Sequence, residues 1–107
     1  MITVFGSINM DLVAFGKRLP KPGETISGDS FTTAAGGKGA NQALAAQRAG
    51  VQTAMAGAVG DDSFATDALV LLRVAGTDLT QVKTVAGATG TAVILIGEDG
   101  ENMISVI

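Results

Sequence analysis

The sequence predicts an α/β fold, and three observations favour it. The chain opens on Ile2-Thr3-Val4-Phe5, a short apolar run closed by Gly6 and typical of a buried parallel strand. Helical and strand patterns then alternate along the chain as far as Val85. Apolar residues make up 47% of the 107 residues, with four Phe and no Trp or Tyr, so the core must consist mainly of Ala, Val, Ile and Leu. Such small side chains suit close packing of helices on one sheet.

Two extended pieces follow the first strand, at Leu12–Lys17 and Thr25–Thr33. The segment between them contains Pro20 and Pro22, which exclude a helix because proline lacks an N–H donor and fixes φ. We therefore expect two strands joined by a stiff connection. Strands of this kind leave the main sheet and can form a lid.

The middle of the chain predicts two helices with a strand between them. The first runs from Gly39 to Ala49, with Gly50 as the residue that ends it, and the strand covers Thr53–Val59. The second helix runs from Ser63 to Ala75 and ends at Gly76. Its apolar face is predicted to comprise Phe64, Ala68, Leu71, Leu72 and Ala75, and its N-terminal cap to come from Asp61, Asp62 and Ser63.

The last third of the chain reads as strands. A short one covers Val82–Val85, and two more, at Thr91–Ile96 and Met103–Ile107, flank the polar turn 97–102 as a hairpin does. Because the chain stops at Ile107 inside a strand pattern, without a turn or cap, we expect it to be a fragment of a longer fold.

Composition excludes several kinds of function. The net charge is −3 with a pI near 4.6 and no basic run, which argues against a nucleic-acid partner and against an anionic membrane surface. The absence of Cys and His removes disulfides, thiolate chemistry, histidine catalysis and the usual zinc sites, so no metal site is expected. The N-terminus has no leader pattern and no stretch has the length of a membrane span, which predicts a cytoplasmic protein.

The richest local pattern is the run from Gly36 to Ala43. Its glycines can bare the backbone to a small polar ligand at the start of a helix, or they can simply form a tight strand-to-helix turn. A P-loop is excluded by Thr32 and Gly39, which occupy positions that need a glycine and a Ser or Thr. A dinucleotide fingerprint is excluded by Gln42 at its third glycine.

Two other polar stretches admit two readings each. Ser7, Asn9 and Asp11 follow the first strand at alternating positions, where an α/β sheet gathers ligands, although such residues can also merely satisfy the backbone of a turn. The segment from Gly57 to Asp61 could be an anion loop followed by a catalytic aspartate, but helix capping explains it better.

The chain resembles the N-terminal part of members of the ribokinase-like (PfkB) family of carbohydrate kinases. Five pieces carry the resemblance, in family order and across the whole chain: Gly6-Ser7-Ile8-Asn9-Met10-Asp11-Leu12, Pro22-Gly23-Glu24-Thr25, the run Gly36 to Ala43, Val59-Gly60-Asp61-Asp62-Ser63-Phe64, and Asp99-Gly100-Glu101-Asn102. Ala65 departs from the family, which has glycine there, and this touches only a helix turn. The resemblance implies a doubly wound, Rossmann-like α/β sheet with a small β-sheet lid, whose strands would lie at about 12–33 and 91–107.

The resemblance also implies a sugar site. It assigns substrate binding to Asn9, Asp11, Gly37, Lys38, Gly39 and Asn41, and an apolar wall to Ala92 and Ile94. A free sugar is neutral and rich in hydroxyls, so carboxylate and amide groups suit it better than net charge does. Alternatively, Lys38 is only a solvated surface charge that does not contact the ligand.

The activity that the resemblance implies is ATP-dependent phosphorylation of a sugar, with ribose as the first expectation and deoxyribose or another pentose as the alternative. ATP, Mg²⁺ and a monovalent cation are the expected cofactors. Family members carry their nucleotide site and catalytic aspartate beyond this part, so no catalytic residue is expected in the chain, and the chain alone should be inactive. Lid-to-lid homodimers are also implied. A non-catalytic sugar-binding or dimerisation module is the competing class.

Overall fold

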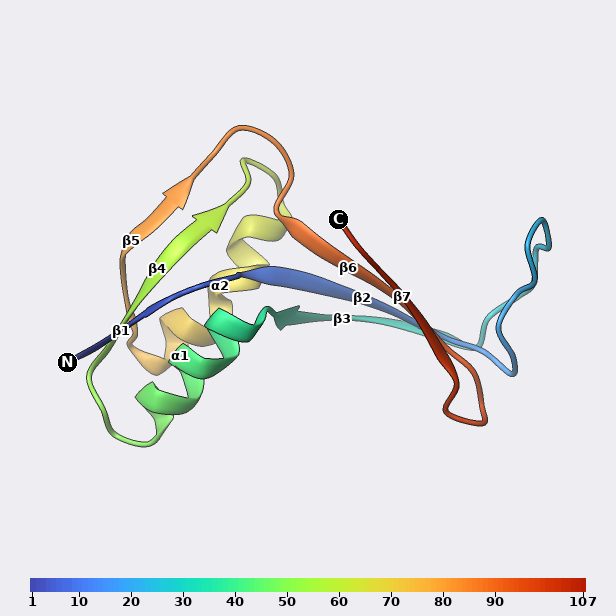
Figure 1. Ribbon diagram of the computed structural model, residues 1–107, viewed down its shortest axis with the longest axis horizontal. Coiled ribbons are helices and arrows are strands. Elements are labelled where there is room, and N and C mark those ends of the chain that lie inside the picture. The colour runs from blue at the N-terminus through green and yellow to red at the C-terminus, as the bar shows by residue number, and fades with distance from the viewer. The chain divides into compact units, whose positions relative to one another are not determined.

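The computed structural model describes all 107 residues and forms two compact units (Figure 1). The α/β unit contains residues 1–10 and 35–90, and the four-stranded unit contains residues 11–34 and 91–107. The elements in chain order are β1 (Ile2–Phe5), β2 (Asn9–Phe15), β3 (Ser30–Gly36), α1 (Lys38–Arg48), β4 (Thr53–Val59), α2 (Phe64–Ala75), β5 (Asp78–Thr84), β6 (Gly90–Ile96) and β7 (Asn102–Val106).

The α/β unit is built on a three-stranded parallel sheet in the order β1-β4-β5. β1 pairs with β4 in an unbroken register from Ile2 opposite Thr53 to Phe5 opposite Ala56. Helix α1 packs on β1 and β4, helix α2 packs on β5, and the two helices also pack on each other (Figure 1). Both helices therefore cover the same face of the sheet. Neither helix is long and apolar enough to cross a membrane.

The core lies between this face and the helices. Met55 in β4 and Leu72 in α2 are its largest fully buried apolar side chains, and Ala43 in α1 is fully buried as well. The alanines let α1 lie close to the sheet, as the composition predicts. The buried residues that form this core cluster are Ile8, Met10, Ala40, Ala43, Met55, Val59, Ala68, Leu69 and Leu72.

The opposite face of the sheet carries no helix from this chain. Phe5, at the end of β1, is 87% exposed there. A shallow groove of about 670 Å³ runs over this surface and is lined by Phe5, Gly6, Ala56, Gly57, Ala58, Thr80, Gln81 and Lys83.

The four-stranded unit is one sheet in the order β3-β2-β6-β7. β6 and β7 form an antiparallel hairpin in which Ala92 lies opposite Val106 and Ile96 opposite Asn102. The turn between them closes through the Gly97 amide, which donates to the Glu101 carbonyl at 2.8 Å. The predicted hairpin is confirmed.

Most predicted elements are confirmed within one residue. β1 and β4 have the predicted bounds, and Ser63 and Gly76 flank α2 as its N-cap and its left-handed C-cap. Gly50 follows the C-cap of α1 with a φ of 96°, a conformation that favours glycine. The α/β class is confirmed with them.

Three details were wrong. β5 begins at Asp78 rather than Val82, because its first residues pair with β4 while exposing polar side chains that hide the strand pattern. β2 and β3 begin at Asn9 and Ser30, three residues earlier and five residues later than predicted. On α2, Leu69 is buried in the core while Leu71 is 40% exposed. The buried face of the helix is therefore rotated about the helix axis relative to the predicted face.

Candidate functional site

The start of α1 is shaped by a close approach of two backbone segments. Gly37 is the N-cap of the helix, with φ 96° and ψ 132°, and a Cβ there would lie 2.5 Å from the Ser7 carbonyl oxygen and 3.0 Å from the Asn9 nitrogen. A Cβ on Gly39 would lie 2.7 Å from Gly6 Cα. Both positions require glycine because real Cβ atoms do not approach backbone so closely.

One backbone hydrogen bond joins the same two segments, and another closes the first turn of the helix. The Ala40 amide donates to the Ser7 carbonyl at 3.0 Å, and the Asn41 amide donates to the Gly37 carbonyl at 2.9 Å. These two amides are therefore occupied within the chain. The tight strand-to-helix turn accounts for Gly37 and Gly39 by packing alone, and it fixes the segment that leads from β1 into Asn9.

Three polar side chains of the α/β unit remain available to a ligand. Asn9 is half-buried at the start of β2, while Lys38 and Asn41 are exposed on the first turn of α1. No hydrogen bond or ion pair joins these three side chains to the rest of the chain. A hollow beside Asn41 measures only about 10 Å³, which is too small for a sugar.

The other predicted site residues belong to the four-stranded unit. Asp11 lies in β2, two residues after Asn9, and is half-buried. Ala92 and Ile94 lie in β6, the neighbouring strand, where Ala92 is buried and Ile94 is half-buried. Their positions two residues apart put both side chains on one face of that strand. The predicted site residues thus form two groups, one in each unit.

The predicted cap of α2 is confirmed in part. Ser63 is the N-cap but makes no side-chain hydrogen bond to the helix. The carboxylates before it bind mainly the connection between β5 and β6. Asp61 accepts from the Gly87 amide at 3.0 Å, and Asp62 accepts from the Thr89 amide at 2.9 Å and the Thr89 hydroxyl at 2.7 Å. Sequence reasoning missed this because both partners are more than 25 residues away.

The electrostatics of Asp62 follow from these contacts. The hydroxyl of Thr89 lowers the pKa of the Asp62 carboxyl, and the Thr89 amide lowers it further, because both donors favour the charged form. Thr89 is itself only 2% exposed, and its hydroxyl accepts from the Gly60 amide at 2.9 Å. Asp62 is therefore engaged as an anion that binds Thr89 within the fold.

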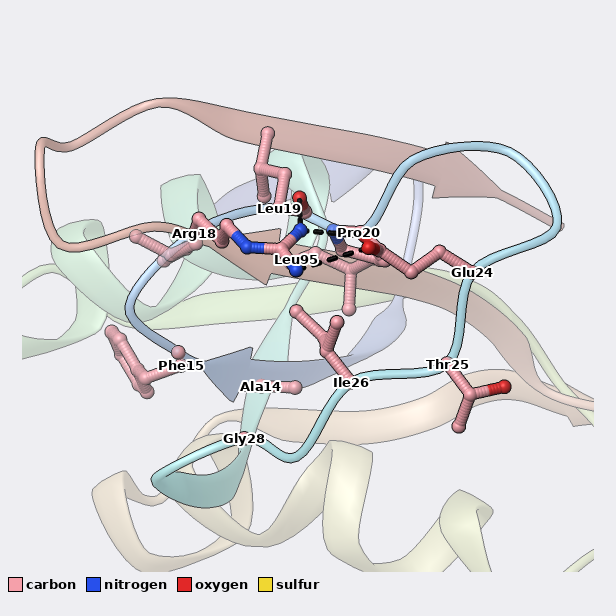
Figure 2. Close-up of a pocket in the computed structure, with 12 residues that line it drawn as sticks. Ala14, Phe15, Arg18, Leu19, Pro20, Glu24, Thr25, Ile26, Gly28 and Leu95 are labelled. Carbon is pink, nitrogen blue, oxygen red and sulfur yellow. Dashed lines mark hydrogen bonds and ion pairs between the residues drawn. The ribbon is translucent and has the colours of Figure 1, made fainter.

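A separate hollow of about 280 Å³ lies in the four-stranded unit (Figure 2). Arg18 and Glu24 form an ion pair at its rim, with Arg18 Nη2 donating to Glu24 Oε2 at 3.0 Å. Glu24 also accepts from the Lys21 amide at 3.0 Å, which closes the turn that contains Pro22 and Gly23. Apolar side chains, among them Leu19, Ile26 and Leu95, line the interior (Figure 2). None of the predicted sugar-binding residues lines this hollow.

Comparison with known proteins extends these observations. Residues 1–107 match the family described as pfkB family carbohydrate kinase. The chain is 47% identical, over 107 residues, to the ribokinase of Bacillus subtilis, and the match covers 99% of this chain and 36% of that protein.

Solved structures give the same result for the fold. A ribokinase from Arabidopsis thaliana complexed with ribose and ATP superposes with a TM-score of 0.91 at 38% identity, covering 99% of this chain and 35% of that one. A ribokinase from Cryptococcus neoformans var. grubii serotype A in complex with ADP has a TM-score of 0.85 at 43% identity, covering 99% of this chain and 33% of that one. The chain therefore spans about a third of the length of the relatives that it matches.

Proposed function

Because the chain belongs to the pfkB family of carbohydrate kinases, we propose that its residues supply the sugar-binding part of an ATP-dependent kinase that phosphorylates ribose. The observation that carries the proposal is the similarity, along 99% of the chain, to a ribokinase solved with ribose and ATP. A cytoplasmic location is part of the same proposal.

The residues suit a neutral, hydroxyl-rich ligand. The Asp11 carboxylate offers only acceptors and can take two hydroxyl donors of the sugar, whereas the amides of Asn9 and Asn41 can both donate and accept. All three side chains are without partners in the chain, so binding sugar breaks no existing hydrogen bond. Gly37, Lys38 and Gly39 are proposed to complete the polar part of the site, and Ala92 and Ile94 its apolar wall.

We propose that ATP and Mg²⁺ bind outside residues 1–107. The sequence of this chain contains no P-loop pattern, and Lys38 is an exposed cation outside any such pattern. Phosphoryl transfer needs the charge around the γ-phosphate to be neutralised. We therefore assign ATP, Mg²⁺ and a monovalent cation to the whole protein, and no chemical step to residues 1–107.

A phosphorylation assay tests whether the sugar-binding part can catalyse phosphoryl transfer without the rest of the protein. The 107-residue chain, incubated with ribose, ATP and Mg²⁺, should give no ribose 5-phosphate above a sample without protein, whereas the complete gene product should give it. Deoxyribose and other pentoses are run in parallel, because a clear preference for one of them would replace ribose as the substrate. Turnover by the 107 residues alone would contradict the proposal.

Substitution of Asp11 tests the sugar site itself. Asp11→Asn should weaken ribose binding to the complete gene product by about 1–3 kcal/mol, because one acceptor of a charge-assisted hydrogen bond becomes a donor. Calorimetric titration with ribose measures the loss, and titration with ATP should be little changed. Unaltered ribose affinity would remove Asp11 from the site.

We also propose that the edge strands of the four-stranded unit pair in a homodimer. β7 is an edge strand, and Met103, Ile104 and Val106 in it are all more than half exposed. Exposed edges of this kind tend to be covered. Sedimentation velocity should detect a dimer that Ile104→Lys weakens. A dimer that binds ribose without any kinase activity in the complete gene product would favour the competing class, a non-catalytic sugar-binding module.

A further inference from the structure

The segment Gly60–Ser63 and the connection from β5 to β6 are joined by a dense set of hydrogen bonds. Gly60, Asp61 and Asp62 on one side bind Gly87 and Thr89 on the other, and we call these five residues the clamp. Besides the side-chain bonds described above, the Asp61 amide donates to the Gly87 carbonyl at 3.0 Å. All five residues belong to the α/β unit.

The clamp is tight because its backbones touch. A Cβ on Gly60 would collide with the Gly87 carbonyl oxygen and with the Thr89 nitrogen. The Thr89 hydroxyl donates to Asp62 and accepts from Gly60, so it connects two points of the opposite segment. Thr89 is thereby held by its amide and by its side chain, in a buried position where hydrogen bonds are costly to lose.

The next residue along the chain, Gly90, lies against the side chain of Asn9, which is a predicted sugar-binding residue. A Cβ on Gly90 would lie 2.5 Å from Asn9 Oδ1 and 3.3 Å from Asn9 Cγ, so Gly90 borders the Asn9 side chain on one side. The side-chain amide of Asn9 makes no hydrogen bond within the chain that would fix its rotamer. The Gly90 backbone therefore borders the space in which the Asn9 side-chain amide lies.

We propose that the clamp, acting through Gly90, holds the side-chain amide of Asn9 in the orientation that binds sugar. Asp62 and Thr89 are in this view positioning residues, which act on the ligand only through Asn9. The inference rests on the proposed function, because it takes Asn9 as a sugar-binding residue. It gives a role to the Val59–Phe64 motif, which the sugar site itself does not use.

The test compares Thr89→Val with Thr89→Ser in the complete gene product. Valine removes the hydroxyl at nearly constant volume, whereas serine retains it. Thr66→Val, at an exposed position in α2, is the matched control. Ribose affinity is measured by calorimetry, and the Asn9 side-chain amide is followed by its ¹⁵N NMR signals, assigned by their loss in Asn9→Ala.

Thr89→Val should shift the Asn9 amide signals and weaken ribose binding about fivefold, while Thr89→Ser and Thr66→Val stay near the parent protein. In an Asn9→Ala background, Thr89→Val should have no further effect on ribose affinity, because coupled residues are not additive. Should Thr89→Val fail to fold, Asp62→Asn replaces it, since this change removes one of the two carboxylate acceptors of Thr89 at nearly constant volume.

Unshifted Asn9 signals in a folded Thr89→Val or Asp62→Asn variant would overturn the inference. So would an equal loss of ribose affinity with and without Asn9, because a general structural role would act in both backgrounds. Failure of the proposed function looks different. In that case Asn9→Ala alone would leave ribose affinity unchanged, while the NMR signals would still report whether the clamp holds the Asn9 amide.

Discussion

Replacing Gly37 by alanine should be among the most damaging changes at the start of α1. Alanine would pay for the left-handed φ of 96°, at about 1–3 kcal/mol, and for the contact of its Cβ with the Ser7 carbonyl, at about 1–3 kcal/mol more. The expected loss in free energy of unfolding is thus about 2–6 kcal/mol. Urea unfolding of the complete gene product, followed by far-UV circular dichroism, measures it.

Gly50 provides a matched control for the steric part of this loss. It has the same φ of 96°, but a Cβ there would have nothing within 4 Å. Gly50→Ala should therefore cost only the conformational part, about 1–3 kcal/mol. If Gly37→Ala costs no more than Gly50→Ala, the close approach of the Ser7 backbone does not determine the glycine, and our explanation of the turn is refuted.

Two further predictions concern the ion pair of the four-stranded unit and the core. The Arg18 guanidinium, together with the Lys21 amide, lowers the pKa of Glu24 to about 2. Because this lies below the value of about 4.3 in an unfolded chain, the pair stabilises the fold above that pH and loses its contribution as the pH falls through 2. A ¹³C NMR titration should find the low pKa in the parent protein and a higher one in Arg18→Gln; equal values would exclude the ion pair as its cause. In the core, Leu72→Ala should lower the free energy of unfolding by about 2–5 kcal/mol, whereas the more exposed Leu71→Ala should cost about 1 kcal/mol or less. Urea unfolding measures both losses. Similar losses in the free energy of unfolding would show that Leu71 contributes to the core as much as Leu72 does.

The sequence predicted the elements whose signals are local. The buried strands β1 and β4 stand out as apolar runs, and the ends of α1 and α2 are marked by Gly50 and Gly76. The predicted strand at β5 was too short because an edge strand with one solvated side has few apolar residues by which it can be recognised. The side of α2 that faces the sheet depends on how the helix packs in the fold. The hydrophobic periodicity of the sequence does not define that side to within one residue.

The candidate site was predictable only in part for the same reason. The family resemblance assigns Asn9, Asp11 and Asn41 to sugar binding, and their free side chains agree with that assignment. Whether they bind sugar stays a prediction. The partnership of Asp62 with Thr89 could not be predicted, since it joins residues far apart in sequence, and capping offered a sufficient local explanation for the aspartate.

The two units are interleaved along the chain, and this has a consequence for folding. The four-stranded unit is assembled from residues 11–34 and 91–107, and its central neighbours β2 and β6 come from opposite sides of the segment 35–90. Closing so long a loop costs entropy before the strands can pair, and the cost falls when the intervening residues are already compact. The α/β unit should therefore form first. Hydrogen exchange should show β4 protected earlier in refolding than β2, and the sheet of β2 and β6 opening first under native conditions.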